Sequence, residues 1–342
     1  MMKSTFLKLA FGAMALAFSA SMSTAQDLKP VKFSLDWTLQ GNHAIWGLAL
    51  KNKYFEQNGM KVSMDRGYGS GDTVVKIAAG AYDIGFTDVN SVIKFNAENP
   101  DRTVLAFYQV FDKTPNSIIA LKKSGITKPA DLTGKKIGAP ESDSSRMMFG
   151  AFAKTNSIDP ASINWVTMAP NLRETMLVQG QVEAISGFSS TSVFNLISAG
   201  VPQDDIVVMS YADNGLDLYG SVLVAMPDYI AKNPDVIKGF VKATISGTVD
   251  LLKDPVAGMA AMQEIEPMFE TKLETARLAF LMDKGVLKSP AFDKNGLGYV
   301  DPARMDLTIK TNSEVYKVAA PAADKVYTTD FLPPASERMP PK

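Results

Sequence analysis

The chain of 342 residues has no cysteine and only one histidine, His43. Without cysteine there is no disulfide, no thiol nucleophile, no iron–sulfur cluster and no cysteine-based zinc site. A metal site built from several histidines is excluded as well, and a Ser-His-Asp triad would have to use His43. No G-x-S-x-G motif accompanies that histidine. These absences leave few common enzyme chemistries open and favour a protein held together by its hydrophobic core.

A run of basic residues is also missing. The 35 lysines and arginines are balanced by 36 acidic residues, which gives a net charge of −1. Nucleic-acid-binding surfaces usually gather Lys and Arg on one face, so this balance argues against a nucleic acid partner. Beyond the N-terminal segment, no apolar run reaches the roughly 18 residues that a membrane-spanning helix needs. The 46% hydrophobic content is that of an ordinary globular protein.

The sequence does contain an export signal at its start. Two lysines precede an apolar run over residues 9–20, which is too short to span a membrane. Ser23 and Ala25 supply small residues at the −3 and −1 positions of a cleavage site before Gln26. We therefore predict that residues 1–25 are removed and that the mature chain, with a net charge of −3, is soluble in a bacterial periplasm. The alternative is a buried first helix of an intracellular domain.

The 317 residues from Gln26 onward exceed the usual length of a single core, so we predict two lobes. Strand-like and helix-like segments alternate, which is typical of α/β lobes with mainly parallel sheets flanked by helices. The predicted strands are residues 31–35, 61–64, 84–86, 103–108, 117–121, 137–139, 164–168, 184–186, 207–210 and 221–225. The predicted helices are residues 42–53, 73–79, 90–96, 145–154, 172–179, 193–198, 236–252, 256–262, 273–282 and 302–318.

The alternation occurs twice along the chain, which predicts two similar lobes. We assign residues 26–118 to the first part of lobe 1 and residues 119–218 to lobe 2. Residues 219–342 are then the second part of lobe 1, with C-terminal helices and a Pro-rich tail over residues 332–342.

The first candidate site follows the first predicted strand. Asp36 and Trp37 come directly after it, and Asn42 and His43 begin the next helix. Ligands of open α/β sheets bind beyond the carboxyl ends of the strands, so these side chains are placed to contact one. Trp37 and His43 would then stack on a flat ligand. The alternative is structural, with Trp37 in the core and Asn42 as a helix cap.

Two loops that open helices provide the second set of candidates. Glycine lets the backbone approach a ligand closely, and the free N–H groups of a helix start attract polar oxygens. Asp72 and the acids of the second loop would instead cap the helices, and they suit a ligand with hydrogen-bond donors better than sulfate or phosphate. Both interpretations stay open for each loop. The candidates are Gly69, Ser70 and Gly71 in the first loop, and Glu141, Ser142 and Ser144 in the second.

The remaining candidates lie at other strand ends and crossings. Thr87 and Asp88 follow a short predicted strand. Gln109 and Tyr219 lie where the chain is predicted to pass between the lobes, and such segments tend to line a cleft. Phe188 follows a strand of lobe 2. The 18 methionines fit core packing better than a metal site, so we predict neither a metal nor a cofactor.

Four motifs, in order along the chain, carry a resemblance to a known family. They are LDW with NHAIWGLALKNKYFEQNGMKV, then GSGDTVVKIAAGAYDIGFTD, then SGITKPADLTGKKIGAP, and finally NPDVIKGFVKATISGTVDLLKDP. Over nearly the whole mature length, the chain resembles the solute-binding proteins of ATP-driven importers for nitrate, sulfonates, taurine and thiamine pyrimidine precursors. The resemblance implies two α/β lobes of the type II arrangement, joined by two crossing segments, with ligand trapped between them by hinge closure.

Within this family, the first candidate site looks most like the pyrimidine-precursor branch, which also includes a fungal pyrimidine synthase. The fungal enzymes hold pyridoxal phosphate on a lysine just after a D-x-G-x segment, where this chain has Thr87. They also carry a cysteine-rich segment that corresponds to residues 216–220 here, which lack cysteine. These two departures predict that this chain is not an enzyme and that His43 contacts ligand without catalysing a reaction.

The resemblance therefore implies a monomeric periplasmic receptor that captures a small heteroaromatic solute, such as a pyrimidine. The receptor would deliver this solute to the permease and ATPase complex of an importer. The acidic residues of the two loops favour a neutral or cationic ring over a sulfonate or nitrate. A receptor for a sulfonate, for nitrate or for another aromatic compound stays open, as does a partnership with a sensor in place of a permease.

Overall fold

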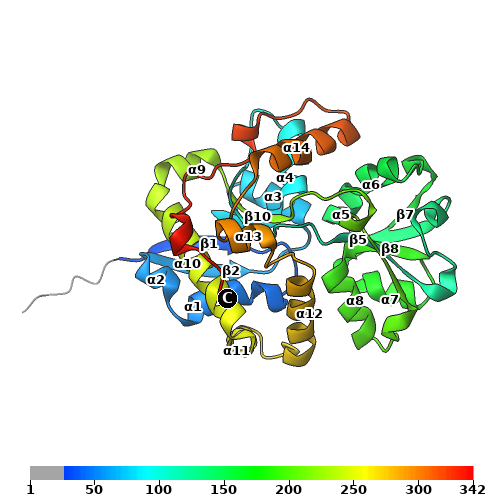
Figure 1. Cartoon of the computed structure of the whole chain (residues 1–342), viewed down its shortest axis with the longest axis horizontal. Coiled ribbons are helices and arrows are strands. Elements are labelled where there is room, and N and C mark those ends of the chain that lie inside the picture. Colours follow the sequence, from blue (N-terminus) through cyan, green and yellow to red (C-terminus); the bar gives the residue numbers. More distant parts are fainter. Residues whose placement is uncertain (1–26, 342) are drawn as a thin grey trace, which may run out of the picture.

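The computed structural model describes residues 27–341, so the predicted signal peptide, residues 1–25, lies outside the described part. Each of two lobes is built on a five-stranded sheet with helices on its faces (Figure 1). The two-lobed α/β fold expected from the sequence is confirmed. Within the described residues, no helix combines the length and the apolar character that crossing a membrane requires.

The first sheet combines strands from both ends of the chain. They are β1 (Lys29–Ser34), β2 (Met60–Asp65), β3 (Ile84–Asp88), β4 (Leu105–Gln109) and β10 (Ser221–Ala225). Their order is β2-β1-β3-β10-β4, in which β1 runs parallel to β2 and β3 while β10 runs antiparallel to β3 and β4. All residues of β3 are buried, as expected for a central strand covered on both faces.

The second sheet repeats this arrangement. Its strands are β5 (Asn116–Leu121), β6 (Lys136–Ala139), β7 (Asn164–Thr167), β8 (Ala184–Phe188) and β9 (Ile206–Ser210). Their order is β7-β6-β8-β5-β9, with β5 antiparallel to β8 and β9. In each sheet, the reversed strand is the one that arrives from the other lobe without the helical crossover that keeps neighbouring strands parallel. The mainly parallel sheets predicted from the sequence are thus mixed sheets with one reversed strand each.

The chain passes between the lobes over residues 110–115 and again over residues 211–220. The predicted lobe boundary between residues 118 and 119 falls inside β5, whose residues all pair in the second sheet. We therefore propose that lobe 2 begins at Asn116, where this pairing starts.

Helices alternate with strands in the first part of lobe 1 and in lobe 2. They are α1 (Ala44–Lys51), α2 (Tyr54–Gln57), α3 (Ser70–Ala78), α4 (Val89–Glu98), α5 (Ser144–Met147), α6 (Phe149–Thr155), α7 (Arg173–Val178) and α8 (Ser189–Ser198). The helix predicted over residues 42–53 is divided, because a 3-10 turn (Gly41–His43) precedes α1 and Lys53 adopts a left-handed conformation, with φ of 59°, before α2. The helix predicted to begin at residue 193 begins at Ser189, since its polar first turn is buried.

The chain after β10 is mostly helical and packs on lobe 1. Its helices are α9 (Pro227–Lys232), α10 (Pro234–Lys253), α11 (Pro255–Ile265), α12 (Thr271–Asp283), α13 (Pro290–Asn295) and α14 (Pro302–Tyr316). All of these except α12 begin with proline, which lacks the N–H that a first turn leaves unpaired anyway. In Figure 1, α12 and α14 lie on opposite sides of the region where the lobes meet.

Aromatic side chains form the centre of the lobe 1 core. Trp46 of α1 is fully buried, with its ring centre 5.0 Å from that of Phe33 in β1 and 4.7 Å from that of Phe86 in β3. Helix α10 crosses α1 at Gly247, where a Cβ atom would lie 2.1 Å from the Ile45 carbonyl oxygen, so only glycine allows this approach. This packing fixes the ends of β1 and β3 that support the site.

Candidate ligand-binding site

A cavity lies between the lobes, next to the segment after β1, the end of β8 and the first turns of α3, α5, α7 and α8. Its volume is about 20 Å³, close to the roughly 10–15 Å³ that a single water molecule needs. The lobes are thus closed around a very small polar space. The lining residues are Asp36, Trp37, Gln40, Asn42, His43, Gly69, Ser70, Phe111, Asp143, Ser144, Arg173, Phe188, Ser190 and Thr191.

On the lobe 1 wall, Asp36 and His43 form a hydrogen-bonded pair. The 3-10 turn that follows β1 brings the imidazole back over the strand end, with His43 Nε2 3.1 Å from Asp36 Oδ1. The Gln40 backbone N–H donates to His43 Nδ1 at 3.0 Å. Because Nδ1 accepts, we assign the imidazole proton to Nε2, which donates to Asp36. This arrangement fixes the orientation of the carboxylate toward the cavity.

The role of His43 differs from the predicted stacking. Its side chain is only 1% exposed, and one face of the ring lies over Trp46, with ring centres 6.3 Å apart. Phe86 contacts the same ring edge to face at 5.9 Å. With both nitrogens and a ring face engaged inside the protein, His43 positions Asp36 and has little surface left for stacking a ligand.

Three polar groups on this wall have no partner within residues 27–341. They are Oδ2 of Asp36, the side-chain amide of Asn42 and Nε2 of Gln40, all of which belong to residues that line the cavity. Asn42 and Gln40 are each only 6% exposed. None of these atoms is among the fully enclosed side-chain atoms that lack a partner, so they are open to the cavity, where a polar ligand can bind them.

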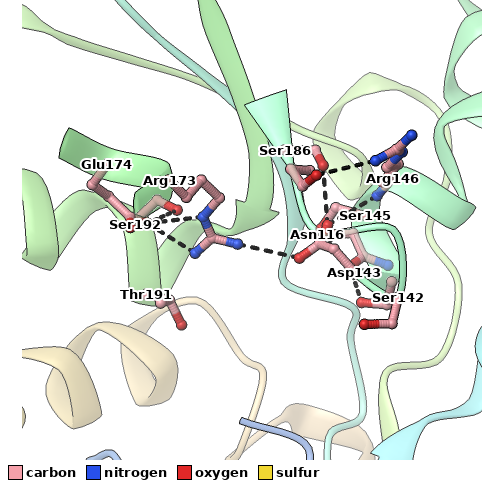
Figure 2. Close-up of polar contacts among 12 residues, drawn as sticks. Asn116, Ser142, Asp143, Ser145, Arg146, Arg173, Glu174, Ser186, Thr191 and Ser192 are labelled. Carbon is pink, nitrogen blue, oxygen red and sulfur yellow. Dashed lines mark hydrogen bonds and ion pairs between the residues drawn. The ribbon is translucent and has the colours of Figure 1, made fainter. Parts of the chain in front are cut away.

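The lobe 2 wall is built on a buried arginine. Arg173, at the start of α7, is 1% exposed and lies between two carboxylates (Figure 2). Its Nη1 donates to Asp143 Oδ2 at 3.2 Å, and its Nε and Nη2 donate to Glu174 Oε1 at 3.0 and 2.8 Å. Gly187 makes room for the guanidinium, since a Cβ atom there would lie 2.5 Å from Nη1.

Serine hydroxyls complete this network (Figure 2). Ser186 Oγ donates to Asp143 Oδ1 at 3.0 Å, and Ser192 Oγ donates to Glu174 Oε1 at 2.8 Å. Burial disfavours the charged form of Arg173, but the charges of Glu174 and Asp143 outweigh it and raise the pKa of the guanidinium. The ion-pair network therefore stays charged and holds the lobe 2 wall in one arrangement.

The lobes contact each other directly across the cavity. The Arg173 guanidinium lies 5.0 Å from the centre of the Trp37 ring, a cation–π contact between lobe 2 and lobe 1. Thr191 Oγ1 of lobe 2 donates to Gln40 Oε1 of lobe 1 at 3.0 Å. One face of Trp37 is therefore covered by lobe 2 in the closed form, and Phe188 is another aromatic side chain at the cavity.

The structure brings eight of the predicted site residues to the cavity. The others lie in the interlobe contact, in the buried region near the crossings or at the surface. The residues at the cavity are Asp36, Trp37, Asn42, His43, Gly69, Ser70, Ser144 and Phe188. The residues away from it are Gly71, Thr87, Asp88, Gln109, Glu141, Ser142 and Tyr219.

The two predicted helix-start loops pack against each other, which accounts for several of the displaced residues. The Gly71 N–H donates to the Ser142 carbonyl at 3.1 Å, so it is not free for a ligand. Gly69 has φ of +129°, and a Cβ atom there would lie 2.5 Å from Ser142 Oγ. These glycines allow the lobes to approach closely. Glu141 is exposed beside this contact.

The residues near the crossings serve structural roles. Thr87 Oγ1 donates to the Ser70 carbonyl at 2.8 Å, and Asp88 caps α4 by accepting from the Asn90 N–H at 3.0 Å. Gln109 Nε2 donates to the Phe111 carbonyl at 2.7 Å. The Tyr219 ring lies under the Arg304 guanidinium, 4.2 Å from it. Burial raises the pKa of Asp88 to about 7, although hydrogen bonds from Asn90 act against this.

Six cavity residues were not among the sequence candidates: Gln40, Phe111, Asp143, Arg173, Ser190 and Thr191. Asp143 lies inside a loop that was considered, between two chosen residues. Ser190 and Thr191 follow β8, so the rule that ligands bind beyond strand ends could have found them. Arg173 carries no local signal, because its partner Asp143 is 30 residues away.

Two lobes that close on a polar cavity define the fold of a periplasmic binding protein. The structure matches that of the alkanesulfonate-binding protein from Xanthomonas axonopodis pv. citri bound to MOPS, with a TM-score of 0.69 and 13% identity over 89% of this chain and 99% of that one. The periplasmic aliphatic sulphonate binding protein of Escherichia coli gives a TM-score of 0.61 and 18% identity over 84% and 87% of the two chains. At such identities the likeness shows the fold alone.

The chain belongs to the NMT1/THI5-like family, whose model matches residues 40–257, more than half of the chain. This confirms the family resemblance found in the four sequence motifs. A formylaminopyrimidine-binding protein from Halalkalibacterium halodurans is 23% identical over 71% of this chain and 74% of its own length.

Other relatives carry the name of an enzyme. A 4-amino-5-hydroxymethyl-2-methylpyrimidine phosphate synthase from Schizosaccharomyces pombe is 24% identical over 66% of this chain and 66% of its own length, just under two thirds. A protein of the same name from Legionella pneumophila is 21% identical over 89% of this chain and 92% of its own length. The expectation that this chain is not an enzyme is therefore contradicted, because several relatives that match most of the chain are named as synthases.

Proposed function

We propose that this chain is the solute-binding component of an ATP-driven importer and that its interlobe cavity takes a small heteroaromatic solute of the aminopyrimidine class. The fold of named periplasmic binding proteins supports the receptor role. The relative named as a formylaminopyrimidine-binding protein supports the ligand class. Both likenesses are distant, so the argument for the ligand depends on the cavity itself.

The observation that carries the proposal is the set of unengaged polar atoms on the lobe 1 wall. Oδ2 of Asp36 is an acceptor, Nε2 of Gln40 is a donor, and the Asn42 amide offers both. An aminopyrimidine presents an N–H₂ donor next to a ring-nitrogen acceptor, which such a set can satisfy together. Hydrogen bonds to these three groups at once would give the ligand both affinity and a fixed orientation.

The charge of the cavity favours the same class. The acidic residues Asp36 and Asp143 line it, while Arg173 is the one cationic residue among its described lining residues and is shared with Glu174. His43 accepts at Nδ1 and is therefore neutral in this arrangement. The net negative charge disfavours a sulfonate or nitrate and favours a neutral ring or one that carries a proton.

Binding requires the lobes to move. A pyrimidine ring is much larger than the cavity of about 20 Å³, so the lobes must separate to admit it and close again around it. The crossings at residues 110–115 and 211–220 provide the hinge. Ligand then stabilises the closed form because it binds that form more tightly than the open one. We propose that the permease recognises the closed form.

The proposal is tested by calorimetric titration of the protein from Gln26 onward. The probes are 4-amino-5-hydroxymethyl-2-methylpyrimidine, formylaminopyrimidine, MOPS and nitrate. We expect saturable binding of at least one pyrimidine and no heat from MOPS or nitrate. If MOPS or nitrate binds and neither pyrimidine does, the proposed ligand class is wrong and the ligand is an oxyanion.

Export is tested separately. We propose that the signal peptide directs the chain to the periplasm and is cleaved before Gln26. Mass spectrometry of the protein recovered from a periplasmic fraction should give an N-terminus at Gln26. A protein that keeps residues 1–25 and stays in the cytoplasmic fraction would contradict the proposed role in import.

A further inference from the structure

A second hollow adjoins the inner cavity, on the side of α8 and α12. It measures about 310 Å³, against about 20 Å³ for the inner cavity, and it opens to solvent. Apolar side chains of Leu39, Phe269 and Leu273 line it together with the acids Glu266 and Glu270. Figure 1 shows α12 of lobe 1 beside α8 of lobe 2 at this place. We call this space the outer hollow.

Gln40 forms the junction between the two spaces, because its side chain lines both. Its Oε1 accepts from Thr191 across the lobes, whereas no residue within 27–341 accepts a hydrogen bond from its Nε2. Although Gln40 as a residue is only 6% exposed, its Nε2 is not among the enclosed atoms that lack a partner, so this donor reaches the open space beside it. Nε2 is therefore available to a ligand atom at the point where the inner cavity meets the outer hollow.

Beside Gly69, the inner cavity is bounded by contacts between the lobes. The Gly71 N–H donates to the Ser142 carbonyl at 3.1 Å, and Ser142 Oγ donates to the Tyr68 carbonyl at 3.0 Å. The backbone at Gly69 lies so close to Ser142 that even a methyl group would clash. A ligand longer than one ring would therefore extend past Gln40 and into the outer hollow.

The charge of the outer hollow is negative. Arg277 is already engaged, because it pairs with Glu274 at 3.0 Å and donates to the carbonyls of Ser190 and Thr191 at 3.2 Å. Glu266 and Glu270 form no ion pair with any described residue; Glu266 accepts only from a backbone N–H, that of Met268, at 3.2 Å. Two carboxylates without an ion-pair partner among the described residues thus line a space open to solvent, next to the Gln40 Nε2 that no described residue engages.

We propose that the outer hollow is a second subsite, which takes a cationic substituent of an elongated ligand whose ring occupies the inner cavity. The ligand class is then an aminopyrimidine joined through a short linker to a positively charged group. The apolar residues of the outer hollow would contact the body of that group, while Glu266 and Glu270 would face its charge. This inference rests on the proposed function, because it requires the ring to bind in the inner cavity.

The test compares two probes that share one ring. The first is 4-amino-5-hydroxymethyl-2-methylpyrimidine, which has no charged substituent. The second is thiamine, in which the same ring is joined through a methylene group to a thiazolium cation. We expect thiamine to bind the wild-type protein at least as tightly as the ring alone at low salt. Its affinity should fall as salt is raised, while that of the neutral ring changes little, because only the charged contact is screened.

The matched variants remove charge at the outer hollow and elsewhere. The double variant Glu266→Gln, Glu270→Gln should weaken thiamine binding by roughly three- to tenfold, the effect of two partly exposed charge contacts. The control Glu264→Gln removes the same kind of charge from α11, where Glu264 pairs with Lys51 at 2.7 Å outside both spaces. We expect this control to leave the binding of both probes unchanged.

The outcomes separate the two proposals. If the ring binds but thiamine does not, or if the double variant binds thiamine as tightly as wild type, the second subsite is overturned and the ring site stands. If neither probe binds, the ring site fails and the subsite fails with it. A thiamine affinity that drops in the double variant but not in Glu264→Gln supports both.

Discussion

The two walls of the cavity contain similar polar residues but use them differently. On lobe 1, Asp36 and Asn42 keep polar atoms that no described residue engages. On lobe 2, Arg173, Asp143 and Glu174 are engaged with one another through short hydrogen bonds. A ligand can form hydrogen bonds with the free polar atoms of lobe 1. The paired side chains of lobe 2 keep their geometry even when no ligand is bound. We therefore propose that lobe 1 recognises the ligand and that lobe 2 closes over it as a rigid cover.

Buried carboxylates show the same contrast. Asp143 and Glu174 of lobe 2 share the charge of Arg173. Asp88 of lobe 1, buried at the start of α4, has hydrogen bonds from Asn90 to one oxygen, but its Oδ2 has no partner among the described residues. We expect the ion-pair network to stabilise lobe 2 and the buried carboxyl group of Asp88 to destabilise lobe 1.

The largest effect should come from removing the cation of the lobe 2 wall. Arg173→Met leaves Asp143 and Glu174 buried without a counter-charge, which should lower the free energy of unfolding by about 3–5 kcal/mol. Urea denaturation of the wild-type protein and the variant measures this loss in the free energy of unfolding. The control Lys135→Met removes a cation from the partly exposed pair with Glu183, where the expected loss is only about 0–1 kcal/mol. Equal losses for the two variants would contradict a special role for Arg173.

The second prediction concerns the pH dependence of stability through Asp88. Burial raises its folded pKa to about 7 from an ordinary value of 3.8, so the folded protein holds this proton to higher pH than the unfolded chain. The contribution of Asp88 is most favourable below about pH 4, and it is lost as pH rises through the folded pKa near 7. Stability should therefore fall by a few kcal/mol across this window.

The variant Asp88→Asn isolates this effect, because an asparagine keeps an oxygen that can accept from the Asn90 N–H. Urea denaturation of both proteins at several pH values from 4 to 8 gives the comparison. We expect the variant to gain stability relative to wild type as pH rises toward about 7 and the difference to level off above it. A constant difference over the whole range would show that Asp88 titrates as it does in the unfolded chain.

The smallest effect should come from hindering closure without touching the cavity. Gly150 of α6 faces Val315 of α14 across the lobes, and a Cβ atom at Gly150 would lie 2.7 Å from Val315 Cγ1. Gly150→Ala should weaken pyrimidine binding about threefold to tenfold, equivalent to roughly 1 kcal/mol, because closing becomes less favourable. Stability without ligand should not fall, since alanine suits a helix better than glycine.

A second substitution serves as the control for this prediction. Val315→Ala in the Gly150→Ala background removes the methyl groups that clash, so affinity should return to the wild-type level. If affinity stays low in the double variant, the loss arises within lobe 2, and the proposed link between closure and binding is incorrect.

The fold could be predicted largely because it depends on local patterns. Residues 84–86 were predicted as a short buried strand, which lies within the observed β3, and the alternation of strands and helices predicted the two lobes. The reversed strands β5 and β10 could not be found in this way, because pairing direction depends on which lobe the chain comes from. The short helix α13 was not among the predicted helices.

The site was predicted less completely, for a physical reason that differs between the walls. Asp36, Asn42 and His43 lie within eight positions of one another after a strand, so their sequence spacing marks them. Arg173 and Asp143 meet only through the packing of lobe 2. Sequence spacing can therefore reveal site residues that come from a single turn. It cannot reveal site residues that meet only when separate segments of the chain pack together.

The central claim is that lobe 1 recognises the ligand while lobe 2 provides a rigid cover, and one paired measurement tests it most directly. Asn42→Ala removes an unengaged amide of the lobe 1 wall, and Ser192→Ala removes the hydroxyl that donates to Glu174 at 2.8 Å in lobe 2. We measure the affinity for 4-amino-5-hydroxymethyl-2-methylpyrimidine and the free energy of unfolding for both variants. Asn42→Ala should lose roughly tenfold or more in affinity with stability unchanged, and Ser192→Ala should lose about 1–3 kcal/mol in stability with affinity nearly unchanged. The reverse pattern, with affinity lost in Ser192→Ala and kept in Asn42→Ala, would contradict the account.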